Sequence, residues 1–397
     1  MKYAIVIMDG AADEPLAELD GKTPLAQAHI PHTDWIAMHG RQGIVQTVPS
    51  GFEPGSDVAL MSVLGYDPKV YHKGRAPLEA AAQGIETSET DWIFRCNLVT
   101  VADSLMIDHS AGHIETIQAT TLVEDLNAQI GNEEIQFYPG VSYRHLMVYR
   151  GDLDFDIKLI PPHDILDKPF AKYRPKGKSG RRLGEIMDRA AEILAAHGVN
   201  QVRLDLGENQ ANHIWLWGQG KRPQFDHFKK RFGLSGAIIT AVDLLRGIGK
   251  LAGMKIVEVE GATGYLDTNY EGKGQAAIQA LQENDLVFIH VEAPDEAAHG
   301  ALVKEKIEAI EQIDEHITGP LLRWLQQRGQ WRILVLPDHP TPIRLRTHSD
   351  KPVPMALAGS GIICKNDLPY NEENARQSGF HIDRGHELMD YFLNVKA

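Results

Sequence analysis

Acidic and imidazole side chains stand directly after two apolar runs of the sequence, where they could bind metal ions. Asp295 and His299 are four residues apart, so both side chains would share one face of a helix. Asp338 and His339 are adjacent, and His348 follows nine residues after His339. Each group alone is more typical of a turn or a solvated helix. Together they offer the mixed oxygen and nitrogen ligands that Mn²⁺ or Zn²⁺ accepts.

Asp9 has a similar position near the amino end of the sequence. Residues 3–8 are continuously apolar, which is typical of a buried parallel strand, and Asp9-Gly10 follows at once. Ligands of open α/β sheets gather beyond the carboxyl ends of the strands, so Asp9 is well placed for a site. A turn aspartate before glycine is the simpler interpretation of this dipeptide alone.

Ser56 is the one candidate nucleophile beside these groups. Pro54 and Gly55 predict a turn, and the apolar spacing after Ser56 predicts a short helix that begins there. The start of a helix favours an anion, because main-chain N–H groups and the positive dipole end point at it. The serine hydroxyl therefore either caps the helix or accepts a phosphoryl group.

The predicted strand order places all of these groups at one edge of one sheet. Two divalent ions roughly 3.5–4 Å apart, held by such a mixed set, can clamp a transferring phosphoryl group. The set comprises seven side chains: Asp9, Ser56, Asp295, His299, Asp338, His339 and His348.

The elements that would position these groups alternate between strands and helices. Runs such as 286–291 and 332–336 predict buried strands, and 304–325 predicts a helix. This pattern predicts an α/β fold, a doubly wound and mostly parallel sheet. Residues 72–230 differ, with short β-like runs such as 155–160, and predict an inserted, smaller α+β cap domain. The catalytic domain would then comprise residues 1–71 and 231–397.

Composition narrows the classes of function. The chain has 397 residues, 43% of them hydrophobic, and a formal net charge of −14. Such a charge argues against nucleic acid and against an anionic membrane surface as partners. Cys96 and Cys364 are the two cysteines, so the sequence predicts no disulfide framework. A soluble protein of the reducing cytoplasm is expected, and no apolar run is long enough for a signal peptide or a membrane span.

Beyond these separate signals, the chain resembles a known family over essentially its whole length. It is similar to the 2,3-bisphosphoglycerate-independent phosphoglycerate mutases, in their archaeal-type branch within the alkaline-phosphatase superfamily. The segments that carry the resemblance are Met8–Gly10, Gly55–Ala59, Leu64–Pro68, Gly74–Ala80, Phe94–Asn97, Trp215–Gly220 and Asp338–His339.

The resemblance implies two divalent metal ions and no 2,3-bisphosphoglycerate. One ion would be bound by Asp295, His299 and His348. The other would be bound by the remaining four groups, Asp9, Ser56, Asp338 and His339. Mn²⁺ is the expected metal, with Zn²⁺ and Mg²⁺ as alternatives.

The resemblance also implies an isomerase of glycolysis that interconverts 3-phosphoglycerate and 2-phosphoglycerate. Ser56 would take the phosphoryl group and return it to the other hydroxyl of glycerate, held under the cap domain. Asp57 either relays protons or caps the helix. The partner is a small anionic phosphorylated hydroxy acid, and a homo-oligomer is left open. Six side chains in motif-like segments are the candidates for substrate binding: Arg75, Arg95, Arg144, His163, Asp164 and Lys273.

Other functions would suit the same groups. Homoserine kinase activity would need ATP, yet the sequence has no glycine-rich Walker loop for its phosphates. A phosphatase or another phosphomutase needs only the metal centre and the serine. A non-catalytic, metal-stabilised binding protein would have no need of a nucleophile at position 56.

Overall fold

The computed structural model describes residues 1–364 and 367–395 and divides the chain into two compact units. The first unit combines Met1–His72 with Phe225–Ala397, and the second is Lys73–Gln224. The boundaries expected from the sequence were 71/72 and 230/231, where the structure has 72/73 and 224/225. Each unit is described by itself below.

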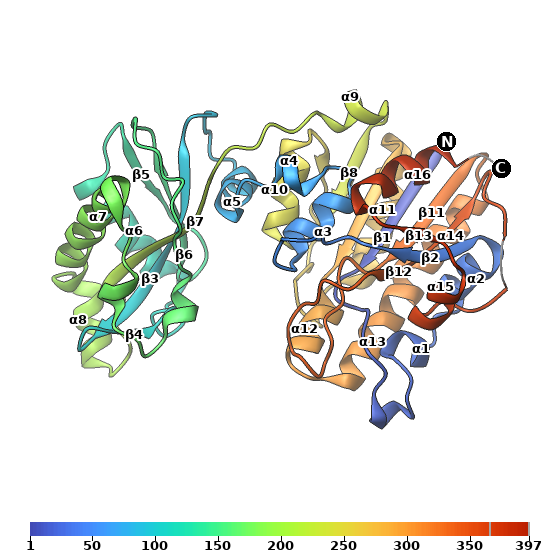
Figure 1. Cartoon of the computed structure of the whole chain (residues 1–397), viewed down its shortest axis with the longest axis horizontal. Helices are drawn as coiled ribbons and strands as arrows, with labels where there is room; N and C mark the ends of the chain where they lie inside the picture. The colour runs from blue at the N-terminus through green and yellow to red at the C-terminus, as the bar shows by residue number, and fades with distance from the viewer. Residues whose placement is uncertain (365–366, 396–397) are drawn as a thin grey trace. The chain divides into compact units, whose positions relative to one another are not determined.

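The first unit is built on an eight-stranded mixed sheet (Figure 1). Most neighbouring strands are parallel, but β12 runs antiparallel to both β11 and β2. In spatial order the strands are β13 (His381–Ile382), β2 (Arg41–Val45), β12 (Val353–Gly359), β11 (Trp331–Leu336), β1 (Lys2–Met8), β10 (Leu286–Val291), β8 (Gly236–Ile239) and β9 (Lys255–Ile256).

The register of the three central strands decides where the site lies. Met8 of β1 pairs with Val291 of β10, and Ile7 pairs with Leu336 of β11, so the carboxyl ends of all three strands meet at one edge. Side chains on both faces of these strands are buried, which explains their predominantly apolar sequences. Two of the helices that pack on them are α11 (Tyr270–Glu283) and α14 (Gly319–Gln326).

One predicted helix is interrupted. The segment expected over 304–325 forms α13 (Val303–Ile313), a π-helical turn at Asp314–Thr318, and α14. Pro320 in the first turn of α14 has no N–H to continue an α-helical ladder. In the π-helical turn the Asp314 carboxylate accepts main-chain N–H bonds from His32 and Thr33, at the start of α2 (Pro31–His39).

The second unit is an antiparallel sheet with helices. The strands are β4 (Leu105–Asp108), β3 (Trp92–Ala102), β6 (Arg144–Tyr149) and β5 (Ile135–Tyr138) in that order, with β7 (His213–Lys221) also paired to β3. Two of its helices are α6 (Thr116–Ile130) and α7 (Gly177–Ala195), whose apolar faces share a core with β3 and β7.

The strand predicted over residues 155–160 is wrong, because this segment forms no strand. Its carbonyl groups bond to side chains of β7 instead of to a neighbouring strand. The Gln219 side chain donates to the carbonyls of Phe155 and Ile157, and the Trp215 indole donates to that of Ile160. The segment thus packs against the sheet without joining its ladder.

Within the described ranges, no helix is both long enough and apolar enough to span a membrane.

Candidate metal centre

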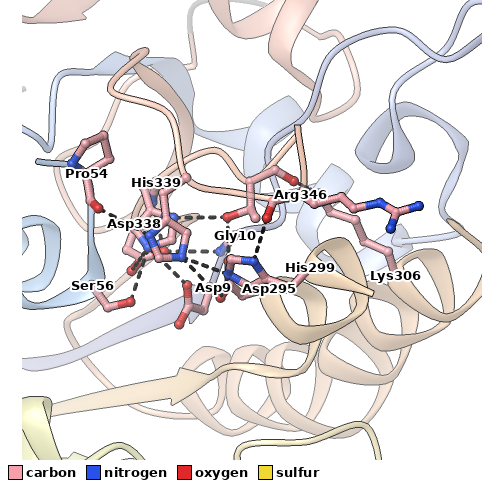
Figure 2. A network of polar contacts seen from close by, with 12 residues as sticks. Asp9, Gly10, Pro54, Ser56, Asp295, His299, Lys306, Asp338, His339 and Arg346 are labelled. Carbon is pink, nitrogen blue, oxygen red and sulfur yellow. Dashed lines mark hydrogen bonds and ion pairs between the residues drawn. The ribbon is translucent and has the colours of Figure 1, made fainter. Parts of the chain in front are cut away.

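The groups predicted to bind metal lie together at the carboxyl edge of the central strands (Figure 2). Asp9 follows β1 directly, and Asp338 lies two residues after β11. Helix α12 (Ala293–His299) begins two residues after β10, which confirms the predicted helix and carries Asp295. Short connections after parallel strands therefore deliver side chains from distant parts of the sequence to one place.

The first cluster comprises Asp295, His299 and His348. The Oδ2 atom of Asp295 lies 3.1 Å from His299 Nε2 and 3.5 Å from His348 Nε2. The two Nε2 atoms are themselves 3.0 Å apart. Three potential ligand atoms thus converge on a space that suits one ion.

The opposite nitrogen of each of these two rings is held by the main chain. His299 Nδ1 lies 3.0 Å from the carbonyl oxygen of Arg346, and His348 Nδ1 lies 3.2 Å from that of Pro54. A carbonyl accepts hydrogen bonds, so each Nδ1 carries the proton that is donated. In a neutral ring the Nε2 lone pair then faces the cluster, as a metal ligand requires.

The second cluster comprises Asp9, Asp338 and His339, all fully buried. His339 Nε2 lies 3.6 Å from Asp9 Oδ1 and 3.4 Å from Asp338 Oδ2. Within the part of the chain that the structure describes, neither of these carboxylate oxygens has a hydrogen-bond partner. Buried, unpartnered carboxylate oxygens are costly unless a cation compensates them.

Ser56 is the first residue of α3 (Ser56–Val63), where the sequence predicted a helix start. Its side chain does not cap that helix, so the capping interpretation is wrong. The hydroxyl Oγ lies instead 3.2 Å from His339 Nε2 of the second cluster. The carboxylate of Asp57, the second residue of α3, lies 2.8 Å from the Nε2 atom of His72.

The electrostatics of the two clusters show how strongly negative charge is concentrated there. Burial, reinforced by the nearby carboxylate of Asp338, raises the pKa of Asp9 well above its usual value. Burial acts in the same direction on Asp295, but hydrogen bonds from His299 and His348 lower the pKa of Asp295 well below its usual value. The bond to Asp295 in turn raises the pKa of His299 to about 9. Divalent cations would relieve the repulsion that raises the Asp9 pKa.

The donor set fits two divalent cations with mixed ligation. Each cluster supplies carboxylate oxygen and imidazole nitrogen, and the serine hydroxyl adds an oxygen to the second. Neither contains a thiolate, which favours Mn²⁺, Zn²⁺ or a similar ion over softer metals.

Sequence reasoning missed several residues that support the ligands. His290 in β10 is fully buried, and its Nε2 lies 2.9 Å from Asp9 Oδ2. Burial lowers the pKa of His290 to about 4, so the neutral ring donates to Asp9. Thr341 contacts ligands of both clusters. His290 is the one polar residue within the apolar run 286–291, which was the only signal for it; no signal pointed to Thr341.

The predicted substrate-binding residues divide between the two units. Three of them, Arg95, Arg144 and His163, line one cavity of about 180 Å³ in the second unit. Asp164 has a 60% exposed side chain and does not line this cavity. Arg75 does not line it either, but its charge helps to lower the pKa of His163, after burial and other neighbours.

Lys273 belongs to the first unit, in α11, and is almost fully buried. Burial lowers the pKa of Lys273 to about 8, and the nearby carboxylate of Glu292 opposes this shift. Glu292 lies between β10 and α12, three residues before Asp295. Lys273 is therefore electrostatically coupled to Glu292, close in sequence to the first ligand cluster of its own unit.

The cavity of the second unit is lined by two arginines that differ in ion pairing. Arg95 is already paired with the carboxylate of Glu79 and lies over the ring of Trp217. Arg144 is exposed and forms no ion pair within the described ranges. Of the two, Arg144 is the one whose guanidinium is available to an added anion.

His145 also lines this cavity, although no sequence pattern had singled it out. The side chain is 2% exposed, and its Nδ1 accepts the main-chain N–H of Gly140 at 3.0 Å. In the neutral ring the proton is consequently on Nε2, which has no hydrogen-bond partner among the described residues. A buried donor without a partner suits a ligand that brings an acceptor oxygen.

The fold and the site define an α/β protein with two clusters of side chains that could each hold a metal ion, beside a serine hydroxyl. Two metal ions beside a nucleophile are one arrangement that supports phosphoryl transfer. A family model described as 2,3-bisphosphoglycerate-independent phosphoglycerate mutase matches residues 37–200. A Geobacter sulfurreducens protein named as a probable mutase of this kind is 48% identical over 99% of this chain and 100% of its own length. The mutase of Methanosarcina barkeri is 47% identical over the full length of both chains. The chain belongs to this family.

Solved structures agree with the sequence comparisons. A Pyrococcus horikoshii protein has a TM-score of 0.84 and 28% identity, over 99% of this chain and 97% of that chain. The cofactor-independent phosphoglycerate mutase of Thermoplasma acidophilum has a TM-score of 0.69 and 25% identity, over 99% of both chains.

Proposed function

We propose that the protein is a metal-dependent phosphomutase that interconverts 3-phosphoglycerate and 2-phosphoglycerate, without 2,3-bisphosphoglycerate and through a phosphoserine at Ser56. Relatives named as 2,3-bisphosphoglycerate-independent phosphoglycerate mutases match the chain along its whole length. The observation that carries the proposal is the position of the Ser56 hydroxyl, 3.2 Å from His339 Nε2 at the second ligand cluster. This reaction belongs to glycolysis and gluconeogenesis, and we place the enzyme in the cytoplasm.

Two divalent ions would occupy the two clusters. Asp295, His299 and His348 would hold one of them. Asp9, Asp338 and His339, together with Ser56, would hold the other. When bound, the ions would lower the pKa of the serine hydroxyl and neutralise charge on the transferring group. Mn²⁺ is the metal we expect.

The serine then works as a relay for the phosphoryl group. Its Oγ forms a bond to phosphorus while the bond between phosphorus and the 3-oxygen of phosphoglycerate breaks. The 2-oxygen of the retained glycerate next attacks the phosphoserine, and the Oγ–phosphorus bond breaks. The start of helix α3 favours the negative phosphoryl group on Ser56.

The mutase reaction requires that glycerate stays bound between the two transfers. A phosphatase needs no such group, because water completes its reaction. We assign the carboxylate and hydroxyls of the acid to the second-unit cavity, where Arg144, His163 and the unpartnered Nε2–H of His145 offer donors. Arginine suits a carboxylate because its planar fork can donate two parallel hydrogen bonds.

One assay tests the proposal directly. Protein loaded with Mn²⁺ is mixed with 3-phosphoglycerate and followed by phosphorus NMR. We expect the 2-phosphoglycerate signal to grow to an equilibrium with the substrate. Free phosphate as the main product would indicate a phosphatase, and no reaction with the metal-loaded protein would contradict the proposal.

A further inference from the structure

The hydroxyl of Thr341 touches both ligand clusters. It lies 2.5 Å from Oδ1 of Asp295 in the first cluster and 3.2 Å from Nδ1 of His339 in the second. Thr341 is fully buried, so water does not compete for these bonds. No other described residue has a hydroxyl hydrogen-bonded to both clusters.

The direction of the two hydrogen bonds follows from the chemistry of the groups. An ionised Asp295 can only accept, so the single proton of the Thr341 hydroxyl is donated to it. The hydroxyl oxygen must then accept from His339, which places the imidazole proton on Nδ1. The inner atoms, Asp295 Oδ2 and His339 Nε2, are thereby left to their clusters. One hydroxyl thus fixes the orientation of a carboxylate and the tautomer of an imidazole.

The position of Thr341 is itself fixed by its main chain. The Thr341 N–H donates to the carbonyl of Ala12 at 3.2 Å, and the Thr341 carbonyl accepts from the buried ammonium of Lys306 at 3.0 Å. Lys306 in turn pairs with Asp13 at 2.7 Å, and the carboxylate of Asp13 also accepts the N–H of Ile343. The segment that carries the hydroxyl is therefore anchored on both sides.

Gly10 lets the main chain pack directly against the Thr341 hydroxyl and the Asp295 carboxylate. It has a positive φ of 62°, and a Cβ atom added there would lie 2.4 Å from Asp295 Oδ1 and 2.7 Å from the Thr341 hydroxyl. The Asp9–Gly10 turn therefore packs directly on the bond between these two side chains. Only glycine permits this approach.

From these contacts we propose that Thr341 is a positioning residue that couples the two metal centres. It holds one ligand of each centre in its binding geometry, so that the affinity of both centres depends on the same hydroxyl. The inference rests on the proposed function, because it presumes that the clusters bind divalent ions. Partners that orient metal ligands in this way typically change metal affinity by about 10–100-fold when removed.

The test compares two variants. T341V keeps the branched shape of the side chain but loses the hydroxyl, and T341S keeps the hydroxyl. Mn²⁺ binding to metal-stripped protein is measured by calorimetry. We expect wild type to bind two ions, T341V to bind both about 10–100-fold more weakly, and T341S to stay near wild type. T318V is the matched control, because Thr318 is fully buried and its hydroxyl has no hydrogen-bond partner among the described residues.

The possible outcomes separate the inference from the function on which it rests. Wild-type protein that binds no divalent ion would overturn the proposed function. If wild type binds two ions and T341V binds them with equal affinity, only the positioning role of Thr341 is overturned. An equal loss of Mn²⁺ affinity in T318V would overturn it too. If T341V does not fold, long-range proton–nitrogen NMR of metal-free wild type decides. A neutral His339 with its proton on Nε2 would contradict the inference.

Discussion

The Nε2 atoms of His299 and His348 lie 3.0 Å apart, while the Nδ1 atom of each ring contacts a main-chain carbonyl. With both Nδ1 protons committed to those carbonyls, two neutral rings would place their lone pairs against each other. Such an arrangement needs a positive charge between the rings. A proton can supply it in metal-free protein, and a divalent cation would supply it more effectively, because it accepts both lone pairs and the nearby carboxylate.

The first prediction follows from that geometry. His348→Ala removes one of three ligands of the first cluster and none of the second. We expect metal-stripped variant protein to take up one Mn²⁺ tightly where wild type takes up two, measured by elemental analysis after gel filtration. Chelation of the wild type should abolish mutase activity, and Mn²⁺ should restore it.

The matched control for this substitution is His381→Ala. His381 lies in β13, is exposed, and belongs to neither cluster. Its loss should leave both ions bound. Two tightly bound ions in His348→Ala, or full mutase activity in chelated wild type, would contradict the assignment of the first cluster.

The second prediction concerns the nucleophile. Ser56→Ala should abolish turnover, because no other hydroxyl lies beside His339 Nε2 among the described residues. The serine caps no helix end, so the free energy of unfolding should change by only about 1 kcal/mol. Mass spectrometry of wild type quenched during turnover should find phosphate on Ser56.

Ser62→Ala is the control on the same helix. The Ser62 hydroxyl donates to the carbonyl of Val58 within α3 and does not touch either cluster. This variant should keep near wild-type activity. Appreciable mutase activity in Ser56→Ala would exclude the covalent mechanism.

The metal-ligand groups were predictable because their sequence signals are local. Asp9 and Asp338 stand just after continuous apolar runs, and the α/β pattern brings the ends of such runs to one edge. The His290 and Thr341 contacts were not predictable from one sequence. They depend on how β10 and the segment after β11 pack in three dimensions, and neither residue has a spacing that distinguishes it from ordinary buried residues.

The second unit contains a segment whose structure was predicted wrongly from local sequence. Residues 155–160 have the apolar composition of a strand, yet side chains of β7 take the hydrogen bonds that a neighbouring strand would need. That competition depends on tertiary packing and overrides local propensity. The cavity that includes Arg144 and His145 likewise comes from strands and loops far apart in sequence.

The third prediction uses the buried imidazole of His145. Burial lowers the pKa of His145 from 6.5 to about 4, against a smaller opposing effect of the Ser142 main chain. Above pH 6.5 the ring is neutral in both the folded and the unfolded state, so its contribution to stability is complete there. As the pH falls toward 4, the unfolded state gains a proton that the folded state does not. Stability should therefore fall between these two values.

His145→Asn keeps an acceptor for the Gly140 N–H and removes the titrating group. Between about pH 7.5 and pH 5, wild type should lose about 2 kcal/mol more unfolding free energy than this variant does. Urea denaturation of both proteins at the two pH values measures the difference. An equal loss in wild type and variant would show that His145 is not held neutral.

The last prediction separates a mutase from a phosphatase through Arg144. This arginine lines the second-unit cavity and forms no ion pair within the described ranges, whereas Arg95 beside it is bound to Glu79. If Arg144 holds the carboxylate of glycerate, Arg144→Ala should lower the mutase rate about a hundredfold, on the order of 3 kcal/mol of transition-state stabilisation. Metal content should not change. Glycerate should escape more often before the second transfer, so phosphorus NMR should show free phosphate rising relative to 2-phosphoglycerate.

The control is Arg181→Ala, because Arg181 is an exposed residue of α7 that does not line the cavity. This variant should change neither the mutase rate nor the ratio of free phosphate to 2-phosphoglycerate. An Arg144→Ala enzyme with the wild-type rate and partition would show that this arginine does not hold the acid.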